Sequence, residues 1–459
     1  MLIRKLSSTG VFIVIILIII AIIVDTSIIR VVTSAGGLRS SVSDIALFVF
    51  MVLVFGVGQY IVMSFVKQEY KARGKGKVND KAKIAGIGLG LDLLDKVVTI
   101  TQYVLLAIPV FAILQMLFIM SYHILILQAT IIITYGLTSV LLALLAKRFF
   151  SWYKSKRNLV VLAYAFAISM ISINAAITII YTNNEFINKP TYIRPVRSPT
   201  GAYTSAEITL SSTYVITSVI SFLLTWIATV LLLKHYSIKL GITKYWIIVS
   251  IPLAYFLSQF QPLFLYSFAE LRLSDPVLFG IIYNLIFSVS KPAGGVLFGI
   301  AFWTVSRRLT SKQVKAYMII SAYGMTLLFA ANQPTGLILI PYPPFGLTSI
   351  CFMVLATYLV FLGIYSSAIS VAEDSRLRQS IRKIALKESQ FLDVIGTAEM
   401  EQEIVRRVVP IFAKTKDSML EETGISSSVE EDDMTSYLQE VLEEVKTKGK
   451  YSNEEPNSR

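Results

Sequence analysis

The sequence predicts an all-α fold, a polytopic bundle of about ten transmembrane helices followed by a short helical region. Three observations support this fold class. Hydrophobic residues make up 55% of the 459-residue chain and charged residues 15%, which is too apolar for an ordinary soluble protein. Long uncharged apolar runs recur, and they match the length of helices that cross a bilayer. The balance of charge also reverses near residue 371.

The reversal of charge divides the chain into regions. Residues 1–370 carry 29 Lys and Arg against 10 Asp and Glu, whereas residues 371–459 carry 13 against 19. We therefore expect a multi-pass transmembrane domain over 1–370 and a cytoplasmic helical region over 371–446. The polar composition of 447–459 predicts a disordered tail.

The first apolar run, residues 11–24, follows Arg4 and Lys5, which is typical of either a signal peptide or a signal anchor. No A-x-A-like cleavage site follows it closely and further spans come after it, so we expect a retained first helix. The ten predicted spans are 11–24, 46–66, 97–120, 124–146, 159–181, 213–233, 245–266, 277–305, 316–331 and 346–370.

Alternate connections between these spans differ strongly in basic residues. With the N-terminus inside, the inner connections hold 22 Lys and Arg and the outer connections hold 6. The positive-inside rule then places both termini in the cytoplasm. Trp152, Trp246 and Trp303 fall near the predicted inner boundaries, as an interfacial aromatic belt requires. We expect a plasma-membrane protein whose basic loops face anionic lipid headgroups at the cytoplasmic face, and not nucleic acid.

Three connections allow two interpretations each. The loop 67–96 contains Gly-Ile-Gly-Leu-Gly at 86–90, which is either a phosphate-binding turn or part of an interfacial amphipathic segment. The outer loop 182–212 is either a lid over the outer mouth or a linker. The connection 332–346 mixes apolar residues with prolines, and is either re-entrant or an ordinary interfacial loop.

After the last span the chain enters residues 371–409 without an obvious helix breaker, and apolar residues recur there at spacings of three and four. This pattern predicts a helix that either pairs with a second copy or folds back on later helices. Pro410 ends or kinks it, and Ser428 to Glu431 form a capping box for a second helix. A homodimer or a cytoplasmic protein partner is therefore expected through 371–446. The apolar positions of the first helix are Leu377, Ile381, Ile384, Phe391, Ile395, Ala398 and Val405.

The sequence contains no motif typical of an enzyme. H-E-x-x-H, G-x-S-x-G and G-x-x-x-x-G-K-[ST] are all missing, and the ten predicted spans contain no Asp or Glu for intramembrane hydrolysis. The single cysteine, Cys351, and the two histidines, His123 and His235 on opposite faces, do not form a zinc-type cluster. We expect no enzymatic activity, no metal and no cofactor.

The eighth predicted span carries an ionisable residue near the bilayer midplane. Lys291 lies roughly 20 Å from either end of 277–305, where insertion of a charge costs at least ~2.5–3.5 kcal/mol. Pro292 removes the N–H that would bond the Ser288 carbonyl, so a helix break is predicted that is similar in mechanics to the discontinuous helices of transporters. The predicted break consists of Pro292, Gly294 and Gly295.

Six amides in the predicted spans share the outer half of the membrane, whereas Gln102 lies in the inner half. They form either a polar pocket open to the outside, with Lys291 at its floor, or interhelical hydrogen bonds worth about 0.6 kcal/mol each. The amides of the outer half are Gln115, Gln128, Asn174, Gln259, Gln261 and Asn284. The predicted ligand-binding set is Lys291, Ser290, Asn284, Gln259, Gln261 and Asn174.

Lys291 has three interpretations. A Schiff-base lysine would need a nearby carboxylate, but Glu270 and Asp275 lie at the outer boundary. An anion-binding lysine suits an anionic or carbonyl-bearing ligand. A structural lysine would bond nearby carbonyls while the Gly295-x-x-x-Gly299 motif packs against a neighbouring helix.

Three function classes follow. The first is a receptor or signalling protein that couples an outward-facing pocket to the cytoplasmic helical tail. The second is a secondary transporter or channel for a small anionic or neutral solute, which the broken span favours and the missing intramembrane carboxylate disfavours. The third is a scaffold or assembly subunit whose membrane domain anchors the tail.

Overall fold

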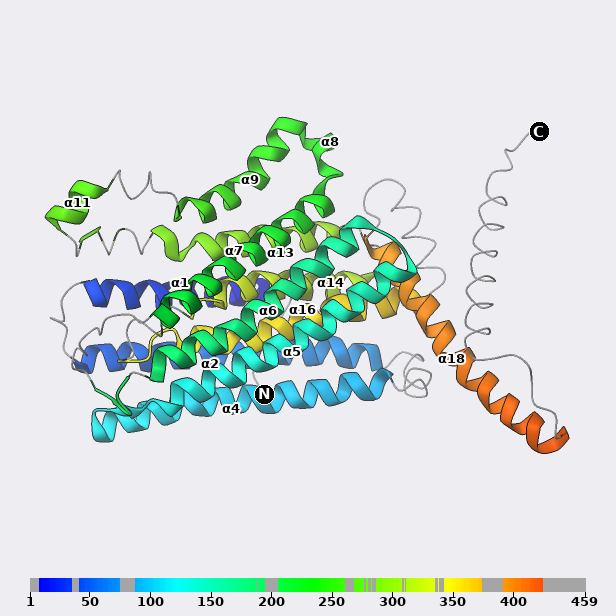
Figure 1. Ribbon diagram of the computed structural model, residues 1–459, viewed down its shortest axis with the longest axis horizontal. Helices are drawn as coiled ribbons and strands as arrows, with labels where there is room; N and C mark the ends of the chain where they lie inside the picture. Colours follow the sequence, from blue (N-terminus) through cyan, green and yellow to red (C-terminus); the bar gives the residue numbers. More distant parts are fainter. Residues whose placement is uncertain are drawn as a thin grey trace.

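The computed structural model is nearly all helical, at 89%. Its long helices lie side by side in one bundle, and helix α18 (Phe391–Thr423) projects from one end (Figure 1). We call this end of the bundle the α18 end. The opposite end carries the strands β1 (Tyr122–His123) and β2 (Tyr192–Ile193), and we call it the hairpin end. The structure describes residues 8–34, 41–74, 87–187, 189–194, 205–260, 268–275, 278–279, 282, 286–307, 309, 311–334, 337, 342–373 and 391–423.

Long helices make up most of the described chain. They are α1 (Ser8–Ser34), α2 (Ser41–Gly74), α4 (Ile87–Ile119), α5 (Leu125–Ser155), α6 (Leu159–Ile187), α7 (Ser205–Leu233), α13 (Ser290–Arg307), α14 (Lys312–Ala331), α16 (Leu347–Glu373) and α18 (Phe391–Thr423). The shorter elements are β1 (Tyr122–His123), β2 (Tyr192–Ile193), α8 (Tyr236–Leu240), α9 (Ile242–Ser258) and α11 (Ala269–Ser274).

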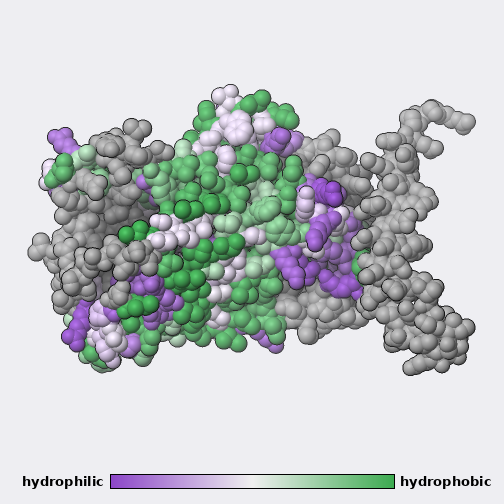
Figure 2. Space-filling view, viewed as in Figure 1, coloured by the Kyte–Doolittle hydropathy of each residue, from purple (hydrophilic) through white to green (hydrophobic). Residues whose placement is uncertain are grey.

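Eight helices of the described chain are long and apolar enough to cross a membrane. They coincide with eight of the predicted spans. The surface over the middle of the bundle is largely apolar, and hydrophilic residues gather toward its two ends (Figure 2). The all-α prediction is therefore confirmed, and the apolar helices indicate a membrane protein. The first and seventh predicted spans correspond to shorter apolar helices, Ile13–Asp25 and Ile242–Ser258, so the count of ten stays a prediction.

The centre of the bundle is α16. Every residue from Leu347 to Val371 is buried, because α14, α5, α4, α2 and α1 surround it. Glycines allow the closest approach: a Cβ on Gly363 would lie 2.5 Å from the Tyr317 carbonyl oxygen, and one on Gly324 would lie 2.6 Å from the Val360 nitrogen. Small residues at such crossings let helix backbones pack directly against one another.

Carboxylates lie within the apolar helices, which corrects the expectation that the spans contain none. Asp25 is 1% exposed, although it directly follows the predicted first span. Asp44, Asp95 and Glu207 fall inside the spans as the structure bounds them. The reason is that the helices extend by several residues beyond the uninterrupted apolar runs.

Asp25 is held by the start of α16. Its carboxylate accepts hydrogen bonds from the Gly346 backbone N–H at 3.1 Å, the Thr348 hydroxyl at 2.8 Å and the Ser349 hydroxyl at 2.6 Å. A carboxylate is favoured at this position because the first N–H groups of a helix have no partner within it. Thus α1 caps the N-terminus of α16.

The hairpin end is built from connections. Tyr122 and His123 pair antiparallel with Ile193 and Tyr192, so the loop 182–212 folds against the connection between α4 and α5. The described part of 332–346 is buried, and Tyr342 stacks on Tyr122 with 6.1 Å between ring centroids. Non-helical backbone is tolerated at membrane depth where protein covers it. Residues 195–204, 335–336 and 338–341 lie outside the described residues.

The first part of α18 packs against α16, α5 and α6 of the same chain. Of the predicted apolar positions, Phe391, Ile395 and Ala398 are buried there, and Val405 is partly buried. The helix does not end at Pro410 but runs through it to Thr423. Leu377, Ile381 and Ile384 lie outside the described residues, as do the segments 75–86, 428–446 and 447–459 and the continuity of helix across 374–390.

Candidate functional site

The irregular start of α13 is the centre of the candidate site. A short helical turn at 286–288 is separated from α13 by a turn residue, Val289. Pro292 cannot donate to the Ser288 carbonyl, and the side-chain Nε2 of Gln333 donates to it instead, at 3.1 Å. Ser288 is 1% exposed and Gln333 is 7% exposed, so this bond satisfies a carbonyl that water cannot reach.

The small residues after Pro292 bring α13 close to its neighbours. A Cβ on Gly294 would lie 2.3 Å from the ring of Phe222 in α7, and one on Gly295 would lie 2.9 Å from a backbone carbonyl of α14. Gly299 approaches the Ala322 carbonyl of α14 in the same way, at 2.7 Å. This part of α13 is therefore fixed between α7 and α14.

The Lys291 ammonium has long contacts to neutral groups. Its Nζ lies 3.5 Å from the Tyr214 hydroxyl and 3.4 Å from the Asn332 carbonyl, and 5.6 Å from the centroid of the Tyr214 ring. Both hydrogen bonds are longer than the 2.7–2.9 Å that is typical of an ammonium on a carboxylate. Ser290 at the same turn donates to the Phe287 carbonyl at 2.7 Å and stabilises the backbone.

Tyr214 links Lys291 to α6. Its ring stacks on Tyr181 with 5.2 Å between centroids, and its carbonyl accepts from Asn174 Nδ2 at 3.3 Å. Asn174 Nδ2 also donates to the Thr217 hydroxyl at 3.0 Å. Asn174 Oδ1 is buried and has no hydrogen-bond partner within the described chain, so an acceptor is left open beside Tyr214.

Asn332 links Lys291 to α5, because its Oδ1 accepts from the buried Tyr135 hydroxyl at 3.3 Å. Five segments of the chain therefore meet here: α5, α6, α7, α13 and the residues that follow α14. We call this group the Lys291 cluster. It consists of Tyr135, Asn174, Tyr181, Tyr214, Lys291 and Asn332.

Among the predicted binding residues that it describes, the structure brings only two together, at Tyr214. Lys291 and Asn174 both contact Tyr214, whereas Ser290 serves its own turn. Gln259 donates to the Phe256 carbonyl at 2.8 Å, at the end of α9. Gln261 and Asn284 lie outside the described residues.

Sequence reasoning did not identify Tyr135, Tyr181, Tyr214 and Asn332. A weak signal for Asn332 exists, because two adjacent amides directly follow the apolar run 316–331. The tyrosines carry no comparable signal, since this chain has 23 of them. In the described residues no group of three or more His, Cys, Asp or Glu side chains could hold a metal ion.

The α18 end contains a second concentration of specific contacts. Phe391 lies 5.7 Å from Tyr164, 6.2 Å from Phe149 and 6.2 Å from Phe302, measured between ring centroids. These rings come from α6, α5 and α13. The start of α18 is thus inserted into an aromatic socket at the end of the bundle, which stabilises it through burial of large apolar area.

Polar contacts surround this socket. Trp152 Nε1 donates to the Glu399 carboxylate at 2.8 Å, and Lys156 pairs with Asp393 at 3.2 Å. The Ser155 hydroxyl also donates to the Glu401 carboxylate. Trp152 is 0% exposed, so its predicted place in an interfacial belt is wrong, whereas Trp246 and Trp303 are 47% and 39% exposed.

Comparison with models of known protein families, with curated proteins and with solved structures finds no match for this chain.

Proposed function

We propose that this chain is a receptor-type or signalling membrane protein that binds a small anionic or carbonyl-bearing ligand at the Lys291 cluster. Binding is coupled to the position of α18. The proposal includes the predicted ten-span topology with both termini in the cytoplasm of a plasma membrane, and no catalytic activity. Its ligand would enter from the hairpin end.

One observation carries this proposal, a continuous packed path from Lys291 to α18. Lys291 contacts the Asn332 carbonyl directly after α14 ends. Along its length α14 packs against both α13 and α16, and α16 packs against α18. A ligand that draws Lys291 away from Asn332 would therefore shift α14 and α16, and α16 packs against α18.

The chemistry of the cluster favours an anion with a hydrogen-bond donor. A carboxylate or phosphate oxygen would give Lys291 a shorter, charge-assisted contact than those it makes at 3.4 and 3.5 Å. The open Oδ1 of Asn174 would accept from an N–H or O–H of the same ligand.

A thermal-shift screen of small carboxylic acids tests the binding. We expect at least one acid to raise the melting temperature of the wild type but not of Lys291→Met, which keeps the length of the side chain. Lys315→Met, an exposed lysine of α14, is the matched control and should behave like the wild type. An acid that stabilises Lys291→Met as much as the wild type would remove Lys291 from the site.

Hydrogen exchange tests the coupling. We expect the same acid to change the exchange of backbone amides in 391–401 of the wild type, and to leave that of Lys291→Met unchanged. Binding without any change in this segment would contradict the receptor function.

A secondary transporter or channel is the second candidate, and the broken start of α13 favours it. The buried hydroxyls of Thr134 and Thr138 on α5 also have no hydrogen-bond partner in the described part of the chain. Uptake of the labelled acid into proteoliposomes, lost in Lys291→Met, would establish this function. If no acid binds at all, the scaffold or assembly subunit becomes the better proposal.

A further inference from the structure

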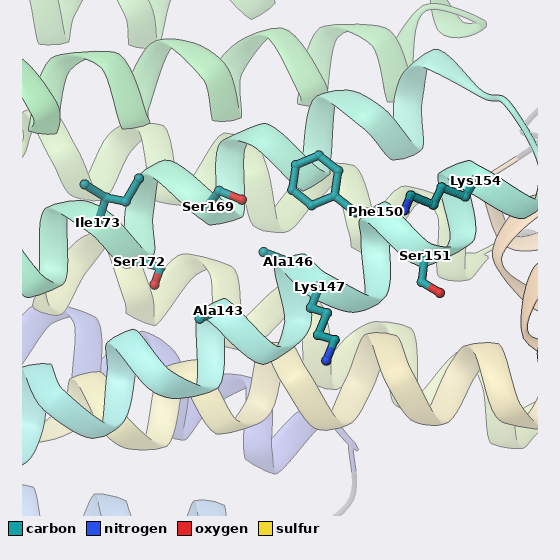
Figure 3. Close-up of a pocket in the computed structure, with 9 residues that line it drawn as sticks. All are labelled: Ala143, Ala146, Lys147, Phe150, Ser151, Lys154, Ser169, Ser172 and Ile173. Carbon is teal, nitrogen blue, oxygen red and sulfur yellow. The ribbon is translucent and has the colours of Figure 1, made fainter.

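A groove of about 530 Å³ lies between α5 and α6 (Figure 3). Its α5 side includes Ala143, Ala146 and Phe150, and its α6 side includes Ser169 and Ile173. The two alanines leave the space that a larger side chain would fill. Phe150 and Ile173 make its walls largely apolar, which suits a hydrocarbon chain.

The two helices that form this groove are joined by reciprocal hydrogen bonds. The Ser172 hydroxyl donates to the Ser139 carbonyl at 2.8 Å, and the Ser139 hydroxyl donates to the Ser172 carbonyl at 3.0 Å. Phe150 also packs edge-on against Phe166 of α6, with 5.5 Å between centroids. The groove is therefore held open by fixed helices and does not depend on a mobile loop.

Two lysines of α5 border the groove toward the α18 end. Lys147 and Lys154 are exposed, and neither has a hydrogen bond or ion pair with another residue that the structure describes. Two neighbouring basic residues do have partners: Lys156 pairs with Asp393, and Arg148 lies over the Tyr365 ring at 5.1 Å. The border of the groove therefore offers two positive charges that no described residue pairs with.

The side chains at this border can reach a common ligand. Lys154 is directed back toward Phe150, whereas Lys147 extends from α5 in the other direction (Figure 3). A lysine without a partner can rotate its long stem, so Lys147 can swing over the groove. Ser151, which also lines it, adds a hydroxyl donor.

The depth of these lysines fits a lipid headgroup. The 31 residues of α5 extend over about 46 Å, whereas the hydrocarbon core is about 30 Å thick. The last turns of α5, which carry Lys147 and Lys154, therefore reach the headgroup region while Ala143 and Ile173 stay beside the acyl chains.

We infer that this groove is a binding site for a phospholipid with an anionic headgroup. Its phosphate lies between Lys147 and Lys154 and accepts from the Ser151 hydroxyl. One acyl chain runs along the apolar walls past Ala143 and Ile173. The opposite face of the same part of α5 holds α18 through Trp152, so the lipid binds next to the docked helix.

Native mass spectrometry of the full-length protein with phosphatidylglycerol tests this site. We expect each of Lys147→Ala and Lys154→Ala to weaken binding of one lipid about 5-fold, and the double variant about 25-fold. Phosphatidylcholine should bind at least as weakly to the wild type as phosphatidylglycerol does to the double variant. Arg157→Ala, which removes an exposed charge of the same turn, should bind like the wild type.

A second variant distinguishes binding of the whole lipid from binding of a phosphate group alone. Ala143→Phe fills the groove without changing the charge, and it should weaken binding as strongly as the double lysine variant. Ala176→Phe adds the same bulk on an exposed position of α6 outside the groove and should have no effect. Unchanged binding in either the double lysine variant or Ala143→Phe would overturn the proposal, as would displacement of the lipid by inorganic phosphate.

Discussion

The Lys291 cluster and the α18 end hold their charged groups in opposite ways. In the cluster, Lys291 has a phenol and a carbonyl at 3.5 and 3.4 Å. At the α18 end, carboxylates of α18 have short partners, with 2.8 Å between Trp152 Nε1 and Glu399, and they surround the socket of three aromatic rings that holds Phe391.

Long contacts to neutral groups are exchanged for a ligand at little cost, whereas an aromatic socket bordered by charged side chains is costly to open. The Lys291 cluster is thus suited to binding, and the α18 end is suited to a defined docked position. Four sets of variants test this contrast.

The aromatic socket should give the largest effect. Phe391→Ala removes the ring that meets Phe149, Tyr164 and Phe302, and we expect it to destabilise docking of α18 by about 3–5 kcal/mol. Hydrogen exchange of the amides in 391–401 measures this. Ile411→Ala, at a position of α18 that is 65% exposed, is the control. Full protection of 391–401 in Phe391→Ala would show that the socket does not hold the helix.

The polar contact beside the socket comes next. Trp152→Phe keeps an aromatic ring but leaves the Glu399 carboxylate, 2% exposed, without its donor, so we expect a loss of about 1.5–3 kcal/mol. Chemical unfolding in detergent measures it. Glu399→Gln in the same chain should recover part of the loss, whereas Trp246→Phe, at an exposed position, should cost nothing. Equal losses in both tryptophan variants would argue against this contact.

Beside the Lys291 cluster, Gln333→Leu should destabilise the fold by about 1–3 kcal/mol, because the buried Ser288 carbonyl loses its donor. Pro292→Ala restores a backbone N–H to that carbonyl, so the double variant should be more stable than Gln333→Leu alone. Thermal unfolding of the four proteins of this cycle measures the coupling. Gln313→Leu, at an exposed position of α14, is the control. Additive effects of the two substitutions would mean that Gln333 does not replace the missing N–H.

The smallest effect concerns pH at the hairpin end. Burial lowers the pKa of Lys189 below its ordinary value of 10.5, and the nearby Glu185 opposes this only in part. The folded protein therefore binds fewer protons than the unfolded chain, so stability rises as pH increases through the range just below 10.5. Unfolding midpoints across this range should show less dependence on pH in Lys189→Gln than in the wild type and in Lys315→Gln. The same slope in all three proteins would exclude Lys189 as its source.

Local patterns predicted much of the fold. The apolar runs identified the eight described helices that are long and apolar enough to cross a membrane, because a run of about twenty apolar residues can be recognised within one segment of the sequence. The sequence also predicted a break at Pro292, Gly294 and Gly295, but these residues lie inside α13, and the irregular turn comes before it, at Val289. The partner that satisfies Ser288, however, lies 45 residues away, and nothing in the sequence relates Gln333 to it.

Long-range contacts explain the errors as well. Trp152 has the sequence position of an interfacial tryptophan, but Glu399 comes from a helix 247 residues later and buries it. Tyr214 lies 77 residues from Lys291 and shows no distinguishing pattern in the sequence. The candidate site was therefore predictable in its lysine and one amide, and unpredictable in the tyrosines that connect them.

The cap that Asp25 provides for α16 has a consequence for synthesis. Its partners Gly346, Thr348 and Ser349 follow it by 321 to 324 residues, which a ribosome adds in roughly 20–60 s. During that time the acid of α1 lacks the donors that it needs in a buried position. When α16 packs into the bundle, it supplies these donors and links α1 to the last helix of the membrane domain. In a chain that is interrupted before α16, the Asp25 carboxylate would still lack these three donors.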